Sequence, residues 1–213
     1  DWISELKIAQ DNKLNFIELT IDYDRIWENP ISSSIGSRYL KKKLTEHQIK
    51  PIACTADYIM HNPPWGSSFS EMVHISKKVI KGLGYISCKV LVIPFVDNTS
   101  LSSKDEQSAL DFLLELEPYL KKHNVRIAIE SDYNPLDLSD FIKNLPEENF
   151  GINYDIGNSA SLGYDYKLEI DSYFDRTIHV HIKDRKYLGN TVPLGQGDAK
   201  LVDVLRLFKS YKY

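Results

Sequence analysis

Six short apolar runs, separated by longer segments with helical spacing, constrain the fold of this chain more than any other feature. Each run is predicted as a β-strand: NFIELTI (15–21), KPIACTA (50–56), KVLVIPF (89–95), RIAIES (126–131), FGINYD (150–155) and TIHVHIK (177–183). Helices are predicted at residues 2–12, 37–47, 69–83, 101–123, 138–145 and 199–211. Strands that alternate with helices pair in parallel through right-handed crossovers, so the sequence predicts one α/β domain over residues 1–213.

The strands place apolar residues on one face and increasingly polar residues on the other. In TIHVHIK, for example, Ile178 and Val180 alternate with His179, His181 and Lys183. Strands of an open parallel sheet that helices cover on both sides are apolar on both faces. A TIM-type (β/α) barrel instead has an outer face under helices and an inner face that lines the barrel. We therefore expect such a barrel, of whose eight strands about six are present, rather than an open doubly wound sheet or a half-exposed antiparallel sheet.

Composition narrows the class of partner. The net charge of −4 argues against a nucleic-acid partner, whose phosphates favour a basic surface. No apolar run is long enough to cross a bilayer and no N-terminal signal peptide is visible, so no membrane association is expected. Only Cys54 and Cys88 are present, and both lie in or beside apolar runs, which predicts buried thiols and a cytoplasmic protein.

Three polar residues stand near the ends of consecutive predicted strands. Glu130, Asp155 and His181 are separated by 25 and 26 residues, close to one βα unit of a barrel. Their side chains should therefore meet at the carboxyl-end mouth of the barrel. Two carboxylates and an imidazole are suited to a divalent cation, which also removes the repulsion between buried carboxylates. An alternative stays open in which each side chain has its own salt bridge, with Lys183, Arg126 or Arg185.

Residues around this set supply further candidates. His179 lies on the same strand face, one layer deeper, and is expected to be a hydrogen-bonded histidine behind the ligands. Lys183 is a candidate for binding an anionic substrate, or for an ion pair with Asp184 at the end of the strand. In the loop PLGQGD, the N–H groups of Gly195 and Gly197 are candidates for phosphate binding, with a plain turn as the alternative.

At these motifs the sequence resembles a known family. The stretches DWISELKIAQDNKLNFIELTID, RIAIESD, INYDIGNSA, HVHIKD and VPLGQGD resemble the xylose-isomerase-like TIM barrels. Within that superfamily they are similar to the group of L-ribulose-5-phosphate 3-epimerase and hexulose-6-phosphate isomerase. Residues from about 58 to 110 match this family only in pattern.

The resemblance implies roles for individual residues. Glu130 in IESD is implied as a metal ligand and as one of two acid/base carboxylates. Asp155 in YDIGN and His181 in HVHIKD are implied as further ligands of one divalent metal ion, which is Mn²⁺, Mg²⁺, Co²⁺ or Zn²⁺. Asn158 and His61 are implied as substrate contacts, with exposure at the surface as an alternative for His61. Gln196 stands where the family often has a glutamate.

The implied activity is isomerisation or epimerisation of a sugar or sugar phosphate. The proton on the carbon α to the carbonyl would be removed, giving an enediolate. Family barrels close with eight strands, and a glutamate on the last strand provides the second acid/base group. The first and last strands are absent from this sequence, so we expect either a fragment or an incomplete barrel, and no epimerase turnover from a chain that ends at Tyr213.

Other functions stay open from sequence alone. They are a sugar dehydratase similar to inosose dehydratase, a metallohydrolase similar to endonuclease IV, and a non-catalytic sugar-binding relic. Bound metal would separate the relic from the enzymes, and binding to abasic-site DNA would identify the hydrolase. The resemblance also leaves a homo-oligomer open, because family members are commonly dimers or tetramers.

Overall fold

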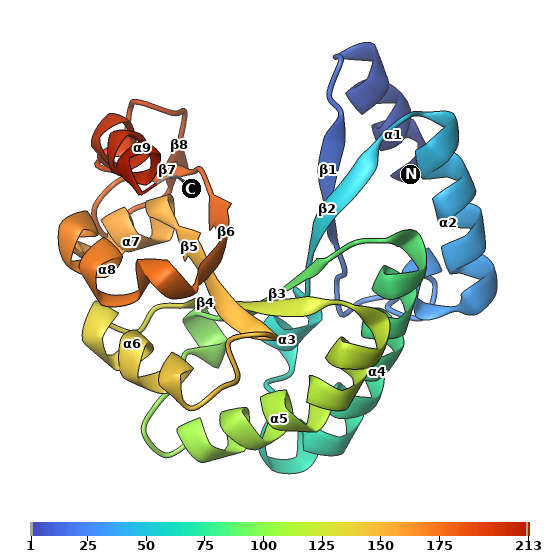
Figure 1. Ribbon diagram of the computed structural model, residues 1–213, viewed down its shortest axis with the longest axis horizontal. Coiled ribbons are helices and arrows are strands. Elements are labelled where there is room, and N and C mark those ends of the chain that lie inside the picture. Colours follow the sequence, from blue (N-terminus) through green and yellow to red (C-terminus); the bar gives the residue numbers. More distant parts are fainter. Residues whose placement is uncertain (1, 212) are drawn as a thin grey trace.

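The computed structural model describes residues 2–211 and 213, and its centre is a sheet of six parallel strands in the order β1-β2-β3-β4-β5-β6. The strands are β1 (Phe16–Thr20), β2 (Lys50–Thr55), β3 (Val90–Phe95), β4 (Arg126–Ser131), β5 (Phe150–Asp155) and β6 (Thr177–His181). The sheet curls into a half-barrel, with β1 and β6 at its two ends (Figure 1). The prediction of an incomplete TIM barrel with six strands is confirmed, and the open doubly wound alternative is wrong.

Helices precede, connect and follow the strands, and the longer connecting helices cover the outer side of the curled sheet (Figure 1). They are α1 (Trp2–Asp11), α2 (Ser34–Glu46), α3 (Tyr58–His61), α4 (Phe69–Ile86), α5 (Glu106–His123), α6 (Pro135–Lys143), α7 (Ile156–Leu162), α8 (Tyr166–Tyr173) and α9 (Leu201–Ser210). A small antiparallel pair, β7 (Asp184–Arg185) and β8 (Thr191–Val192), precedes α9. The sequence did not predict α3, α7, α8 or this pair, because such short elements carry too little periodicity.

Local chemistry explains where two of the helices begin and end. The side chain of Asn134 accepts hydrogen bonds from the N–H groups of Leu136 and Asp137, both at 3.1 Å, and Pro135 is the first residue of α6. An asparagine cap followed by proline is a strong helix start. Helix α4 runs past the predicted end at residue 83 and stops where Ser87 takes a left-handed backbone with φ of 64°.

The two faces of the central strands differ as the alternation predicts. Ile127, Ile129 and Ile152 are fully buried on the outer face. Burial of one such side chain contributes about 1.5–3 kcal/mol to the free energy of unfolding. On the inner face, Asn153 of β5 donates to Glu130 of β4 at 2.8 Å. The polar residues therefore face the inside of the half-barrel.

Two further expectations can be compared with the fold. Cys54 and Cys88 are free and buried, as predicted, and burial raises the pKa of the Cys88 thiol to about 12. Among the residues that the structure describes, none of the helices has the length and apolar character needed to cross a membrane.

Candidate metal centre

The three predicted ligands meet at the carboxyl ends of neighbouring strands. Glu130 lies one residue before the end of β4, while Asp155 and His181 are the last residues of β5 and β6. Asp155 and His181 are register partners across the parallel β5–β6 pair, which sets their side chains next to each other. One donor atom from each of the three residues lies within 4.8 Å of the others. The sequence spacing thus predicted a real cluster.

Two amide side chains hold the Glu130 carboxylate. Asn153 donates to its Oε2 at 2.8 Å, and Asn158 donates to its Oε1 at 2.6 Å. Glu130 and Asn153 are both buried, with exposed fractions of 7% and 2%. Because both oxygens have a fixed donor, the carboxylate has one orientation, and its Oε2 lies 3.3 Å from Nδ1 of His181.

Asp155 caps the next helix with one oxygen and leaves the other oxygen for the site. Its Oδ1 accepts the N–H of Asn158 at 2.8 Å, at the start of α7. Its Oδ2 is buried and accepts no hydrogen bond, although Nζ of Lys183 lies 2.8 Å away and Nδ1 of His181 lies 3.6 Å away. Burial raises the pKa of this carboxyl, but His181, Lys183 and the helix N–H together lower it below its usual value.

The imidazole of His181 stands between carboxylates on both of its sides. Its Nδ1 faces Glu130 and Asp155, and its Nε2 lies 3.1 Å from Oε1 of Glu18. Burial disfavours the charged ring, but the hydrogen bonds to the three carboxylates outweigh burial and raise the pKa of His181 to about 11. A cation bound at Nδ1 would take the place of a proton there, because a histidine ligand must be neutral.

The donor set fits a divalent metal ion. Oδ2 of Asp155 is buried without a hydrogen bond and has the ion pair with Lys183 as its main compensation, so it keeps a lone pair for a cation. Oxygen donors from Glu130 and Asp155 with a nitrogen from His181 suit Zn²⁺, Mn²⁺ or Co²⁺. The alternative of separate salt bridges holds only in part: Asp155 pairs with Lys183, but the described ion pairs of Glu130 and Asp155 include no arginine.

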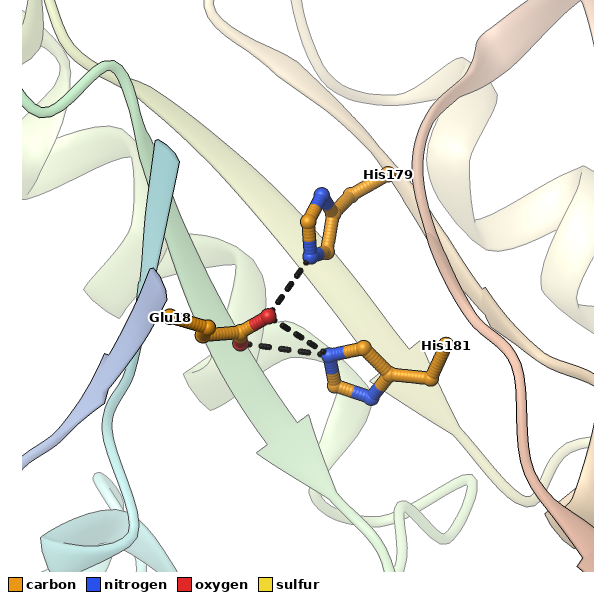
Figure 2. Close-up of side chains that lie close together, drawn as sticks. All are labelled: Glu18, His179 and His181. Carbon is orange, nitrogen blue, oxygen red and sulfur yellow. Dashed lines mark hydrogen bonds and ion pairs between the residues drawn. The ribbon is translucent and has the colours of Figure 1, made fainter. Parts of the chain in front are cut away.

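A second group of side chains shares His181 with the first. Nε2 of His179 lies 2.9 Å from Oε2 of Glu18, and Nε2 of His181 lies within 3.2 Å of both Glu18 oxygens (Figure 2). His179 is therefore hydrogen-bonded, as predicted. Hydrogen bonds from its two histidine partners and from Thr55 hold the pKa of the Glu18 carboxyl well below its usual range, against the effect of burial, which is the largest single influence.

The sequence did not identify Glu18 as part of the site. Glu18 lies on the polar face of FIELTID, but it belongs to β1, at the opposite end of the sheet from β6. Only the curl of the half-barrel brings the two ends face to face across its interior. Polarity on an inward strand face was the one available signal, and it did not indicate which partners Glu18 would meet.

Asn158 and Lys183 both lie at the candidate site. Asn158 bridges Glu130 and Arg185, since its Oδ1 accepts from Nη1 of Arg185 at 2.8 Å. Lys183 pairs with Asp155, so the predicted ion pair with Asp184 is wrong. The Nζ of Lys183 thus lies beside one of the candidate ligand oxygens.

His61, Gly195 and Gly197 have other contacts in this structure. His61 ends α3, is exposed, and stacks on Tyr23 with 6.1 Å between ring centroids. The N–H groups of Gly195 and Gly197 each donate to Oδ2 of Asp184 at 2.8 Å. A phosphate at these N–H groups would have to compete with a buried carboxylate.

The fold and the cluster define a class of protein: (β/α) barrels with a candidate metal site of carboxylates and an imidazole at the carboxyl-end mouth. A comparison with protein families identifies the family. Residues 6–213 match the family described as xylose isomerase-like TIM barrel, and the chain belongs to this family. A comparison with curated protein sequences finds no match.

Several solved structures with a similar fold are described as complexes with a metal ion or a sugar. A xylose isomerase-like TIM barrel protein from Mycobacterium smegmatis in complex with magnesium has a TM-score of 0.79 at 14% identity, over 100% of this chain and 78% of its own. The IOLI protein with a bound zinc atom has a TM-score of 0.73 at 19% identity, over 98% and 78%. The D-allulose 3-epimerase from Methylomonas sp. in complex with D-allulose has a TM-score of 0.75 at 15% identity, over 99% and 74%. At these identities the likeness concerns the fold.

Proposed function

We propose that this chain is a metal-dependent isomerase or epimerase of a keto sugar or its phosphate, which acts by proton transfer on the carbon α to the carbonyl. The observation that carries the proposal is the convergence of Glu130, Asp155 and His181 within 4.8 Å at the ends of three neighbouring strands. The described magnesium, zinc and D-allulose complexes of similar folds support the metal and the substrate class. Within the family, the motifs IESD, YDIGN and HVHIKD favour the L-ribulose-5-phosphate 3-epimerase and hexulose-6-phosphate isomerase group.

The protein's own side chains divide the work of the reaction. When bound, a divalent cation polarises the carbonyl and neighbouring hydroxyl oxygens and stabilises the negative charge that develops on them. Glu130 removes the α proton, leaving an enediolate, and returns it to the adjacent carbon in an isomerisation. Asn153 and Asn158 fix the carboxylate of Glu130 toward the substrate. Epimerisation needs a second acid/base group on the opposite face of the enediolate.

Lys183 supports a negatively charged substrate group. The ammonium of Lys183 stands beside the ligands with its side chain 32% exposed, so it is accessible to a negatively charged substrate group. We assign it to binding a phosphate or an enediolate oxygen. The two free, buried cysteines are in keeping with a protein that works in a reducing cytoplasm.

The test is proton exchange, because it detects the first chemical step even when turnover is incomplete. Purified protein would be loaded with Mn²⁺ and its metal content measured. It would then be freed of excess ion and incubated with a panel of ketoses and ketose phosphates in D₂O. We expect deuterium to enter the carbon α to the carbonyl of at least one sugar, as observed by mass spectrometry and by NMR after removal of the paramagnetic ion.

A matched variant and the product identify the reaction. Glu130→Gln keeps the size of the side chain and removes the base, so deuterium incorporation should fall by a factor of about 100 or more. An unsaturated product would indicate a dehydratase, and cleavage of abasic-site DNA would indicate a hydrolase. Absence of stoichiometric metal in the wild-type protein would contradict the proposal outright and favour a sugar-binding relic.

A further inference from the structure

The side chain of Glu18 crosses the inside of the half-barrel and joins its two ends. It starts on β1 and reaches His179 and His181 on β6, at 2.9 Å and 3.1 Å, with its carboxylate between the two imidazole rings (Figure 2). The two strands are not neighbours in the sheet. A contact from one end of the sheet to the other, made by one carboxylate, needs an explanation beyond strand pairing.

Glu18 is itself held in place from a third strand. Thr55, at the end of β2, donates its hydroxyl to the same carboxylate. Thr55 and Thr20 are register partners in the β1–β2 pair, which brings Thr55 close to Glu18. The carboxylate therefore has three donors around two oxygens, and its position is fixed before any ligand binds.

The direction of these hydrogen bonds determines which ring nitrogen of His181 is free. An ionised carboxylate only accepts hydrogen bonds, so the Nε2 atoms facing Glu18 must carry the hydrogens. A neutral imidazole with a hydrogen on Nε2 has its lone pair on Nδ1. In His181 that Nδ1 faces Oε2 of Glu130 and Oδ2 of Asp155. When the ring is neutral, as a metal ligand must be, Glu18 thus leaves the lone pair of His181 on Nδ1, beside the two carboxylates.

From this geometry we propose that Glu18 is a positioning residue, which holds the metal-binding tautomer and ring orientation of His181 without itself contacting the metal. The inference rests on the proposed function, because it assumes a metal between Glu130, Asp155 and His181. A carboxylate that accepts the second N–H of a metal-bound histidine raises the basicity of that ligand and fixes its direction. His179 shares the same carboxylate and keeps Glu18 from turning away.

The competing arrangement has the metal between Glu18, His179 and His181, whose donor atoms are also within 4.8 Å of one another. A neutral imidazole has one lone pair, so His181 cannot serve both sets at once. Both oxygens of Glu18 already accept hydrogen bonds, whereas Oδ2 of Asp155 is buried and accepts none. Oδ2 of Asp155 has an ion pair with Lys183 but no hydrogen bond, so it keeps a lone pair for a cation, which favours the set that contains Asp155.

The experiment compares metal affinity in Glu18→Ala, Glu18→Gln and a matched control. Glu169→Gln is the control, because Glu169 is also buried and also accepts three hydrogen bonds, from Tyr154, Ser159 and Tyr173, none of which is one of the three ligands. Affinity for Co²⁺ would be measured by calorimetry, together with the visible absorption spectrum of the bound ion. Melting temperatures of the metal-free proteins would report the purely structural role of each side chain.

We expect Glu18→Ala to bind Co²⁺ about 10- to 100-fold more weakly than the wild type and to shift the cobalt spectrum. Glu18→Gln should recover part of the affinity, because the amide oxygen still accepts from one ring. Glu169→Gln should change the affinity by less than about threefold. Unchanged affinity in Glu18→Ala would overturn the inference and leave the proposed function standing. A wild-type protein that binds no metal would overturn both.

A second measurement uses the wild-type protein, so it does not depend on whether a Glu18 variant folds. Zinc-loaded wild-type protein with ¹⁵N-labelled histidines reports the state of each ring nitrogen by NMR, and a His181→Gln spectrum assigns the signals. We expect His181 to carry hydrogen on Nε2 and the metal on Nδ1. Hydrogen on Nδ1 with the metal on Nε2 would place the ion beside Glu18 and refute the inference.

Discussion

Nζ of Lys183 lies 2.8 Å from Oδ2 of Asp155, the buried carboxylate oxygen that we assign to the metal. The ammonium therefore neutralises the very atom that a divalent cation would bind. Lys183→Met should increase metal affinity by about tenfold or more, because repulsion between unit charges 4 Å apart is about 1 kcal/mol even in water and a divalent ion doubles it. Calorimetric titration with Mn²⁺ measures this change directly.

The same variant separates the two roles of Lys183. The metal-free variant should melt at a lower temperature, because Asp155 loses its partner while it stays buried. If Lys183 binds an anionic substrate group, the KM for a sugar phosphate should rise while metal affinity improves. Lys186→Met is the matched control, since Lys186 is more exposed and pairs with Asp198 at 3.8 Å. Weaker metal binding in Lys183→Met would contradict this account.

The two histidines of HVHIKD should differ in their effect on metal binding. Only His181 offers a ring nitrogen to Glu130 and Asp155, whereas His179 contacts Glu18. We expect His181→Gln to weaken metal binding by a factor of about 100 or more, and His179→Gln by less than about tenfold, the lower end of the range for residues behind the ligands. Equilibrium dialysis with Zn²⁺ gives both values. The reverse ranking would mean that the metal lies between Glu18 and His179.

The sequence predicted most of the fold because strand alternation is a local signal. All six strands lie within two residues of their predicted bounds, since each one alternates apolar and polar residues or is apolar throughout. Helix ends were less accurate. For example, α5 begins at Glu106 rather than near residue 101, because residues 102–105 form a turn before the helix, in which the N–H of Asp105 donates to the carbonyl of Ser102.

The candidate site was predictable where it depends on neighbouring strands. Glu130, Asp155 and His181 follow one another on consecutive strands, so their spacing alone brings them together. Glu18 was not predictable, because its contact with β6 depends on how far the sheet curls. The partners of Asp184 were also not predictable, since they depend on the path of the loop from residue 193 to residue 199.

Asp184 should stabilise the conformation of the loop from residue 193 to residue 199. Its carboxylate is fully buried and accepts the N–H groups of Gly195 and Gly197 at 2.8 Å and of Ala199 at 3.1 Å. Asp184→Asn places an NH₂ group among these donors, and we expect a loss of about 1–3 kcal/mol in the free energy of unfolding. Urea unfolding gives this value, and faster proteolysis between β8 and α9 would locate the change.

The effect of Asp184 should depend on pH in a defined direction. Burial raises the pKa of its carboxyl, but the backbone N–H groups of the loop outweigh burial and lower the pKa below the usual value of 3.8. A carboxyl with a lowered pKa contributes its stability above the unfolded-state value and loses it as pH falls through the folded-state value. The stability difference between the wild type and Asp184→Asn should therefore be constant near neutrality and shrink below about pH 4. A constant difference down to pH 2 would show that the charge has no part in holding the loop.

Gly157 provides a final test, in which helix propensity and packing predict opposite results. It is the second residue of α7, directly behind Asp155 and Asn158, where alanine would normally favour a helix over glycine by about 1 kcal/mol. A Cβ at this position, however, would lie 2.9 Å from the carbonyl carbon of Lys183 and 3.0 Å from its Cβ. Those contacts are too short, so we expect the segment after β6 to move and the contact of Lys183 with Asp155 to change. We expect Gly157→Ala to lower the free energy of unfolding by about 1–3 kcal/mol, and to raise the KM for an anionic substrate as Lys183→Met does. Thermal unfolding and steady-state kinetics measure the two effects, and a more stable Gly157→Ala protein would mean that α7 and the Lys183 segment are not packed as closely as this structure places them.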